Sequence, residues 1–253
     1  MKLQKLLSYT RQVVEDYHLI TSGDKIAIGV SGGKDSLTLL YALSNLKRFY
    51  PSPFEIVAIG VNLGYKTMDY TEVKKLCVQL DISFYEVKTH IKQIVFDERK
   101  EKNPCSLCAK LRKGALNAKA KELGCNKIAY AHHKDDFIET ALLSLFYEGH
   151  FYVFPPSTYL DNMDLTVIRP FLYIPEKDII GFANKYQLPV QKNPCPADGY
   201  THRQYIKELL KKLNYENKGV KDRIFHAIIH SDIPGYHSTA SDLQSVPEHK
   251  QEQ

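Results

Sequence analysis

Apolar and polar residues follow two alternating periods along the first 150 residues of the chain. Residues 3–17 place their leucine and valine side chains on one stripe at helical spacing, which predicts an amphipathic helix docked on the body of the protein. Short β-branched apolar runs then alternate with helical patterns. The predicted strands are residues 25–30, 54–61, 83–87 and 127–131, and the predicted helices are residues 36–49, 69–80, 110–123 and 135–147.

Strands that alternate with helices indicate an α/β protein, with a parallel sheet covered by helices on both faces and ligands at the carboxyl ends of the strands. After residue 149 the pattern weakens into a Pro-rich loop, a short strand near Val167 and three helices, at residues 176–186, 202–213 and 220–229. We therefore expect four parts: an N-terminal helix in residues 1–22, the α/β domain in 23–150, a helical extension in 151–230 and a flexible polar tail in 231–253.

The composition is typical of a globular protein and does not by itself indicate a function. The 253 residues are 43% hydrophobic and 25% charged, which is ordinary for a globular protein with one main domain. No apolar run reaches the roughly 18 to 20 residues needed to span a bilayer, and no signal peptide is recognisable, so we expect a cytoplasmic protein without a membrane partner. A net charge of +5 permits an RNA partner without requiring one.

The strongest chemical signal is the segment SGGKDS, which lies between the first predicted strand and a helix. Two glycines let the backbone approach an anion, and the N–H groups at the helix start supply donors. A plain glycine turn is the alternative, and Asp35 after Lys34 excludes a Walker A loop. A carboxylate beside phosphates suggests Mg²⁺ and a triphosphate that is split with loss of pyrophosphate. The expected ATP-binding residues here are Ser31, Gly32, Gly33, Lys34, Asp35 and Ser36.

This loop after a first strand resembles that of the PP-loop ATP pyrophosphatases, which have an adenine nucleotide α-hydrolase-like fold. The resemblance implies that the chain adenylates a carbonyl oxygen and then displaces AMP with a nucleophile. Enzymes of this type include amidating enzymes, tRNA lysidine synthetase and several tRNA thiolases, so a second motif is needed to identify the substrate.

The five cysteines supply that second motif. Cys105 and Cys108 form a C-x-x-C pair in a predicted loop before a basic helix, where we expect the thiols to ionise easily. Cys195 is flanked by prolines, like that pair, whereas Cys77 and Cys125 have apolar neighbours and are expected in the core. The residues alone are compatible with three kinds of site: a 4Fe-4S cluster, a zinc site completed by His or Asp, and a redox pair.

Several further segments together resemble the tRNA 2-thiocytidine synthetase family, TtcA, over most of residues 1–215. They are PCSLCAKLRKGAL, AHHKDDFIETALLSLFYEG, the Pro155-Pro156 loop, Ile168-Arg169-Pro170 and Arg203-Gln204. The resemblance implies ATP-dependent 2-thiolation of cytidine at position 32 of the tRNA anticodon loop. The sulfur would come from a cysteine desulfurase or free sulfide, and the resemblance allows a homodimer.

In that family the C-x-x-C pair and a later cysteine hold a 4Fe-4S cluster with one open iron, which implies Cys105, Cys108 and Cys195 as ligands here. Asp198 stands where a further cysteine is usual and is an additional candidate ligand. One alternative is a non-catalytic redox or metal-binding module that uses the C-x-x-C pair and has a vestigial phosphate loop. Two enzymatic alternatives also remain. The 2-thiouridine synthetases share the three cysteines but also carry zinc-binding cysteine clusters that five cysteines cannot supply. A zinc-containing PP-loop amidating enzyme would need no sulfide.

A second polar segment follows the fourth predicted strand. Asp135 and Asp136 are both able to cap the helix that follows. Alternatively, one of them holds Mg²⁺ or positions the activated base. We expect His132 to contact ATP or a sulfur-bearing intermediate. The predicted catalytic residues are Lys34, Asp35, Arg112, Asp135 and Asp136. The basic helix after Cys108 is either a solvated face or a surface for RNA phosphates. The predicted RNA contacts are Lys110, Arg112, Lys113 and Arg203.

Overall fold

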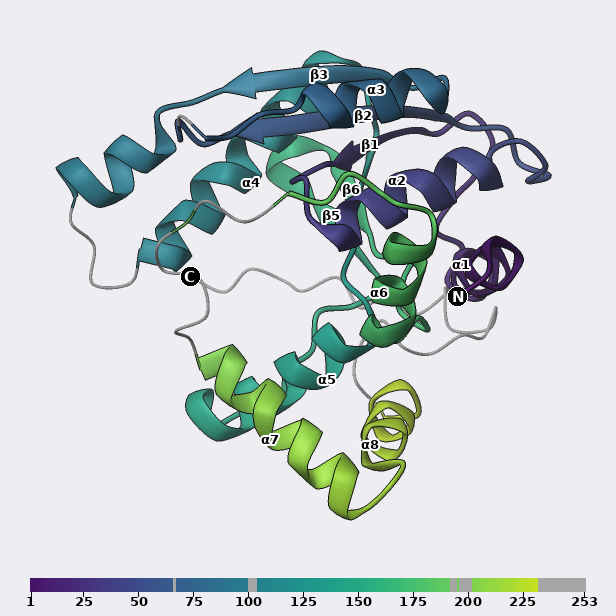
Figure 1. Ribbon diagram of the computed structural model, residues 1–253, viewed down its shortest axis with the longest axis vertical. Helices are drawn as coiled ribbons and strands as arrows, with labels where there is room; N and C mark the ends of the chain where they lie inside the picture. The colour runs from purple at the N-terminus through teal and green to yellow at the C-terminus, as the bar shows by residue number, and fades with distance from the viewer. Residues whose placement is uncertain (66, 100–103, 192–194, 196–201, 232–253) are drawn as a thin grey trace, which may run out of the picture.

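The computed structural model describes residues 1–65, 67–99, 104–191, 195 and 202–231. A six-stranded sheet with the order β3-β2-β1-β4-β6-β5 forms its centre (Figure 1). β5 is antiparallel to its neighbour, and the other pairs of strands are parallel. The strands are β1 Lys25–Gly29, β2 Glu55–Asn62, β3 Ser83–Lys88, β4 Lys127–Ala129, β5 Ser157–Leu160 and β6 Leu165–Ile168.

The sheet separates two apolar cores, because successive side chains of a strand point to opposite faces. On β1, Ile26 and Ile28 pack in the core that contains residues of α1, α2 and α6, whereas Ala27 between them belongs to the core under α4. All three are fully buried. The described helices are α1 Leu3–Asp16, α2 Lys34–Leu46, α3 Thr71–Gln79, α4 Pro104–Glu122, α5 Lys134–Leu143, α6 Glu176–Lys185, α7 His202–Glu216 and α8 Val220–Ile229.

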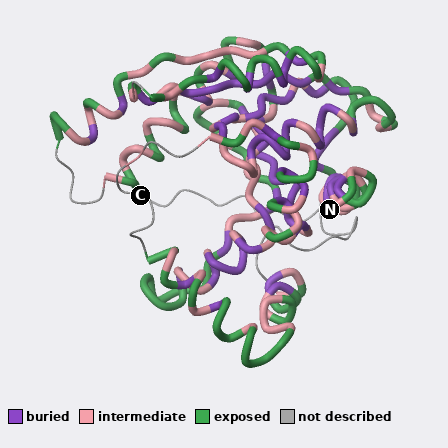
Figure 2. The backbone as a smooth tube through the Cα atoms, in the orientation of Figure 1, coloured by how far each residue is buried: buried purple, intermediate pink, exposed green. Residues whose placement is uncertain are grey.

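The last two helices of the C-terminal extension, α7 and α8, pack on α5 rather than on the sheet. α7 and α8 contact α5 and each other, and the three helices lie together below the sheet in Figure 1. Figure 2 shows that burial is concentrated around the sheet, while α7 is largely exposed and α8 is only partly buried. The two helices bury only a few side chains: Ile206 and Leu210 on α7, and Phe225 and Ile228 on α8.

The α/β class, the parallel sheet and the two helical additions predicted from the sequence are confirmed. One boundary was wrong: α4 begins at Pro104, so Cys105 and Cys108 lie in its first turns and not in a loop. Proline suits a first helical position because its missing N–H has no partner there in any case. The short strand β5 and the π-helical segment Gln93–Glu98 were not predicted, and the helix predicted over residues 135–147 becomes π-helical at Ser144–Glu148. Of the predicted tail, residues 232–253 lie outside the described residues.

No helix in the described part of the chain combines the length and apolar character needed to cross a membrane.

Candidate functional site

The hydroxyl groups of Ser31 and Ser36 fix the conformation of the loop from Ser31 to Ser36 through hydrogen bonds to its backbone. The Ser31 backbone N–H donates to Ser36 Oγ at 3.1 Å, the Gly33 N–H donates to Ser31 Oγ at 3.3 Å, and Ser36 Oγ donates to the Gly33 carbonyl at 3.0 Å. Gly32 has φ of +82°, and a β-carbon there would lie 3.0 Å from Gln191 Oε1. The loop leads directly into α2, so the helix N-terminus provides an anion site at the end of β1.

A cavity of about 240 Å³ opens where β1, β2 and β4 end. This is the edge at which open α/β sheets bind ligands, because the loops diverge on either side of it. One wall is α4, and the other is formed by the strand ends and the segment after β4. The lining residues are Gly29, Val30, Ile59, Val61, Ala109, Arg112, Lys113, Leu116, Tyr130 and His132.

His132 presents a neutral imidazole to this cavity. Its ring lies 4.6 Å from that of Phe154, and the Arg169 guanidinium lies 5.0 Å from the Phe154 ring centre. Burial lowers the pKa of His132 to about 4, although Asp136 opposes the shift. Its Nδ1 atom is buried and has no hydrogen-bond partner among the described residues. The sequence identified His132 but gave no sign of Phe154 as its support.

His133, next in the chain, is the residue that caps α5. Its backbone N–H donates to Asp136 Oδ2 at 2.9 Å, and the Asp136 N–H donates to His133 Nδ1 at 3.4 Å. His133 Nε2 lies 3.8 Å from Asp35 Oδ1, an oxygen without a hydrogen-bond partner in the described structure. The structure thus brings Asp35 and Asp136 together on either side of one histidine, and neither Asp135 nor Asp136 is the capping residue itself.

Asp135 points away from this cluster. Its Oδ2 accepts the backbone N–H of Glu176 at 2.7 Å, and its Oδ1 accepts Lys221 Nζ at 2.6 Å. These donors outweigh burial and hold the pKa of Asp135 below its usual value. Asp135 therefore ties α5 to α6 and α8, and its role in catalysis stays a prediction.

Lys34 is paired with two carboxylates. Its Nζ lies 3.0 Å from Asp35 Oδ2 and 3.1 Å from Glu176 Oε1. The two acids raise the pKa of Lys34 even though burial opposes this, so the amine is a cation at neutral pH. Sequence reasoning missed Glu176, which is separated from Lys34 by more than a hundred residues and carries no local signal beyond Pro175 at the helix start.

The cysteines divide as the sequence predicts. Cys105 is exposed, Cys108 and Cys195 are half-buried, and Cys77 and Cys125 are buried in the cores. Cys105 and Cys195 each lie close enough to Cys108 to act on its ionisation.

The ionisation of Cys108 differs from the expectation. Burial raises the pKa of Cys108, and Arg112 only partly offsets this, so easy ionisation of this thiol was wrong. Tyr65, in the segment after β2, is hydrogen-bonded to Cys195, a contact that the sequence did not reveal. Asp198 lies outside the described residues.

The donor set matches an iron–sulfur cluster in its chemistry, since three thiols supply sulfur ligands and leave a fourth position open. As the side chains stand, no three His, Cys, Asp or Glu residues in the described ranges are arranged to hold a metal ion. Ligation of a cluster by Cys105, Cys108 and Cys195 therefore stays a prediction.

The predicted basic residues fall into separate groups. Arg112 and Lys113 line the cavity, and Lys110, two residues after Cys108, is exposed. Arg203 on α7 instead faces α5, with Nη1 3.2 Å from Glu139 Oε2 and 3.5 Å from Asp136 Oδ1. Whether any of these residues contacts RNA stays a prediction.

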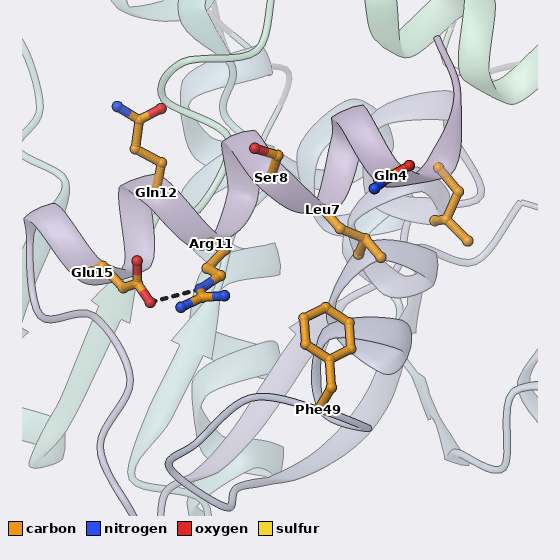
Figure 3. Close-up of a pocket in the computed structure, with 8 residues that line it drawn as sticks. Gln4, Leu7, Ser8, Arg11, Gln12, Glu15 and Phe49 are labelled. Atoms are coloured by element: carbon orange, nitrogen blue, oxygen red, sulfur yellow. Dashed lines mark hydrogen bonds and ion pairs between the residues drawn. The ribbon is translucent and has the colours of Figure 1, made fainter.

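A second hollow, of about 790 Å³, lies on α1 beside Phe49 (Figure 3). Arg11 and Glu15 form an ion pair of 2.7 Å along its wall. None of the predicted site residues in the described ranges lines it, and it lies away from the strand ends that carry the phosphate loop.

Comparison with known proteins matches residues 3–213 to the family described as the PP-loop domain. The chain is 38% identical over 220 residues to the tRNA-cytidine(32) 2-sulfurtransferase of Citrifermentans bemidjiense, covering 86% of each chain. It is 37% identical over 250 residues to the enzyme of the same name from Geobacter metallireducens, covering 98% of this chain and 96% of the relative.

Two solved structures resemble the fold. The U34-tRNA thiolase NcsA from Methanococcus maripaludis, determined with its [4Fe-4S] cluster, gives a TM-score of 0.71 at 25% identity and covers 87% of this chain and 76% of its own. The NH3-dependent NAD synthetase from Campylobacter jejuni gives a TM-score of 0.50 at 17% identity, with 90% and 92% covered. The second similarity concerns the fold alone.

Proposed function

This chain belongs to the PP-loop family, within the group of the tRNA-cytidine(32) 2-sulfurtransferases, and on that premise we propose that it uses ATP to replace oxygen with sulfur at carbon 2 of cytidine 32 in tRNA. The observation that carries the proposal is the arrangement along α4. Cys105 and Cys108 occupy its first turns, and Arg112, one turn after Cys108, lines the cavity beside the phosphate loop. Sulfur transfer at the cysteines would thus take place next to the cavity in which the base is activated.

The phosphate loop supports the activation step. The loop N–H groups, the α2 N-terminus and Lys34 would hold the triphosphate, and Asp35 Oδ1, which lacks a protein donor in the described structure, would hold Mg²⁺. The cytidine oxygen at carbon 2 attacks the α-phosphorus, and pyrophosphate leaves. The adenylated carbon is then an electrophile, because AMP is a far better leaving group than hydroxide.

Residues around the cavity would orient the two substrates. His132 is neutral at physiological pH, so it would offer a hydrogen bond without adding charge, and its buried Nδ1 has no hydrogen-bond partner in the described structure. Arg112 and Lys113 add positive charge at the opposite wall, where phosphate or adenylate oxygens would lie. Asp136 is fixed by His133 and Arg203, so it is suited to a positioning role.

Cys105, Cys108 and Cys195 would hold the 4Fe-4S cluster. When bound, such a cluster with three thiolate ligands supplies one iron that is free to carry a sulfide for transfer to carbon 2. Tyr65 would support Cys195 through the hydrogen bond it already makes. The sulfur donor, a homodimer and a cytoplasmic location stay predictions.

The target base separates this proposal from its nearest alternative. The solved relative NcsA is a U34-tRNA thiolase, whereas the curated relatives at 37% to 38% identity act on cytidine 32. The test is to incubate the anaerobically reconstituted protein with unmodified tRNA, Mg-ATP and sulfide, and to analyse the nucleosides by mass spectrometry. We expect ATP-dependent 2-thiocytidine. Formation of 2-thiouridine instead would support the alternative, and zinc with sulfide-independent activity would support an amidating enzyme.

A further inference from the structure

The carboxylate of Glu176 lies between two lysines from different parts of the fold. Lys34 Nζ, from the phosphate loop, is 3.1 Å from Glu176 Oε1. Lys207 Nζ, from α7, is 2.7 Å from both Oε1 and Oε2. The Glu176 side chain is only 14% exposed, so the carboxylate depends on these cations in place of water.

Glu176 is ionised at neutral pH. The two lysines outweigh burial and hold the pKa of Glu176 below its ordinary value. Its backbone is fixed as well, because the Glu176 N–H donates to Asp135, which in turn accepts Lys221 of α8. The ion pairs line a cavity of about 530 Å³ between α5, α6, α7 and α8. The carboxylate is therefore charged and immobile at neutral pH.

Binding of a triphosphate at the phosphate loop would change the pairing of Lys34 with Glu176. Lys34 must leave Glu176 to reach the phosphates, since one ammonium group cannot neutralise both at full strength. A poorly hydrated carboxylate left without a cation is strongly destabilised. Lys207 would prevent this, because it contacts both oxygens of Glu176 and lies on a different helix from Lys34.

We infer that Lys207 supports ATP binding through Glu176: Glu176 competes with the phosphates for Lys34, and Lys207 neutralises Glu176 so that the lysine is free to turn to the phosphates. The inference rests on the proposed ATP binding. It makes α7, which also supplies Arg203 to Asp136 and Glu139, a part of the nucleotide site although it belongs to the C-terminal extension.

The test is a double-mutant cycle on the full chain, with the dissociation constant of Mg-ATP measured by isothermal titration calorimetry. Lys207→Met keeps most of the aliphatic stem and should weaken ATP binding about tenfold, within the range of couplings in shared charge networks. Glu176→Gln should bind ATP at least as tightly as the parent. In the Glu176→Gln background, Lys207→Met should have no further effect, because no carboxylate remains to be neutralised.

Two further variants make the result specific. Lys207→Arg keeps the charge and should restore binding close to that of the parent, while Lys211→Met, one turn later on α7, should bind like the parent because Lys211 makes none of the ion pairs found in the described structure. Additive effects of Glu176→Gln and Lys207→Met, or equal behaviour of the Lys207→Met and Lys211→Met variants, would overturn the inference alone. A parent protein that binds no ATP would overturn the proposed function as well.

Discussion

Asp35 Oδ1 lies 3.8 Å from His133 Nε2, although Asp35 belongs to the first turn of α2 and His133 caps α5. The two residues meet because each follows a parallel strand, and those strands, β1 and β4, are neighbours in the sheet. The chain leaves β1 toward β2 on one side and reaches β4 on the other, so this edge is the switch point of the sheet. The phosphate loop and the second polar segment therefore share one site.

The first prediction concerns Asp35→Asn, which removes the charge of the expected Mg²⁺ ligand while preserving its size. We expect the fold and the cluster to remain and tRNA-dependent pyrophosphate release to fall by about a hundredfold, as for other losses of preorganised charge stabilisation. Asp81→Asn is a matched control, because Asp81 is exposed and its φ of 55° suits asparagine. Unaltered pyrophosphate release in the Asp35 variant would exclude the role.

The second prediction concerns the cysteines. Changing Cys105, Cys108 or Cys195 to Ser should abolish thiolation and destabilise the cluster, because a hydroxyl is a poor iron ligand. Cys77→Ala and Cys125→Ala should keep the cluster and lower the free energy of unfolding by about 1 kcal/mol through lost packing. Iron and acid-labile sulfide per chain after anaerobic reconstitution provide the measurement. Equal cluster loss in the Cys125 variant would show that the ligands are assigned wrongly.

The third prediction separates two groups of basic residues on α4. Replacing Arg112 and Lys113 together with Ala should weaken tRNA binding and reduce the slope of log K against log salt by about 1 to 2, because fewer counterions are released. Lys119 and Lys121 provide the matched control on the same helix, since they pair with Glu122 and Asp164. An unchanged slope in the first variant would assign Arg112 and Lys113 to ATP or to the cavity wall instead.

The fourth prediction follows from His132. Burial lowers its pKa in the folded protein to about 4, whereas the ordinary pKa of histidine, expected in the unfolded chain, is 6.5. Between these values the unfolded chain binds the proton more readily, so this contribution to stability is present above pH 6.5 and is lost as the pH falls toward 4. At pH 5 the loss relative to pH 7 should be at most about 2 kcal/mol.

Urea unfolding at pH 7 and pH 5, with the parent and a His132→Gln variant, measures this contribution. The variant should lose less stability between the two pH values than the parent, because glutamine does not titrate. If both proteins lose the same amount, His132 is not the group that binds the proton on unfolding.

The sequence by itself determined the features that depend on neighbouring residues. The phosphate loop could be identified because its glycines, its lysine and the following helix start are contiguous, and the strands around it are continuous apolar runs. The helix start at Pro104 was missed because a proline and polar residues also suit a loop. The strand β5 was missed because it is short and carries an exposed, partly polar face at the sheet edge.

Only the tertiary structure decided which distant residues complete the site. Glu176, Lys207 and Lys221 reach the phosphate loop and α5 from the C-terminal extension, and Tyr65 reaches Cys195 from the segment after β2. Charged residues on helix surfaces are ordinarily solvated, so neither their spacing nor their neighbours distinguish them in the sequence. Their roles arise from the packing of α7 and α8 on α5, since burial makes a carboxylate dependent on the cations that this packing brings to it.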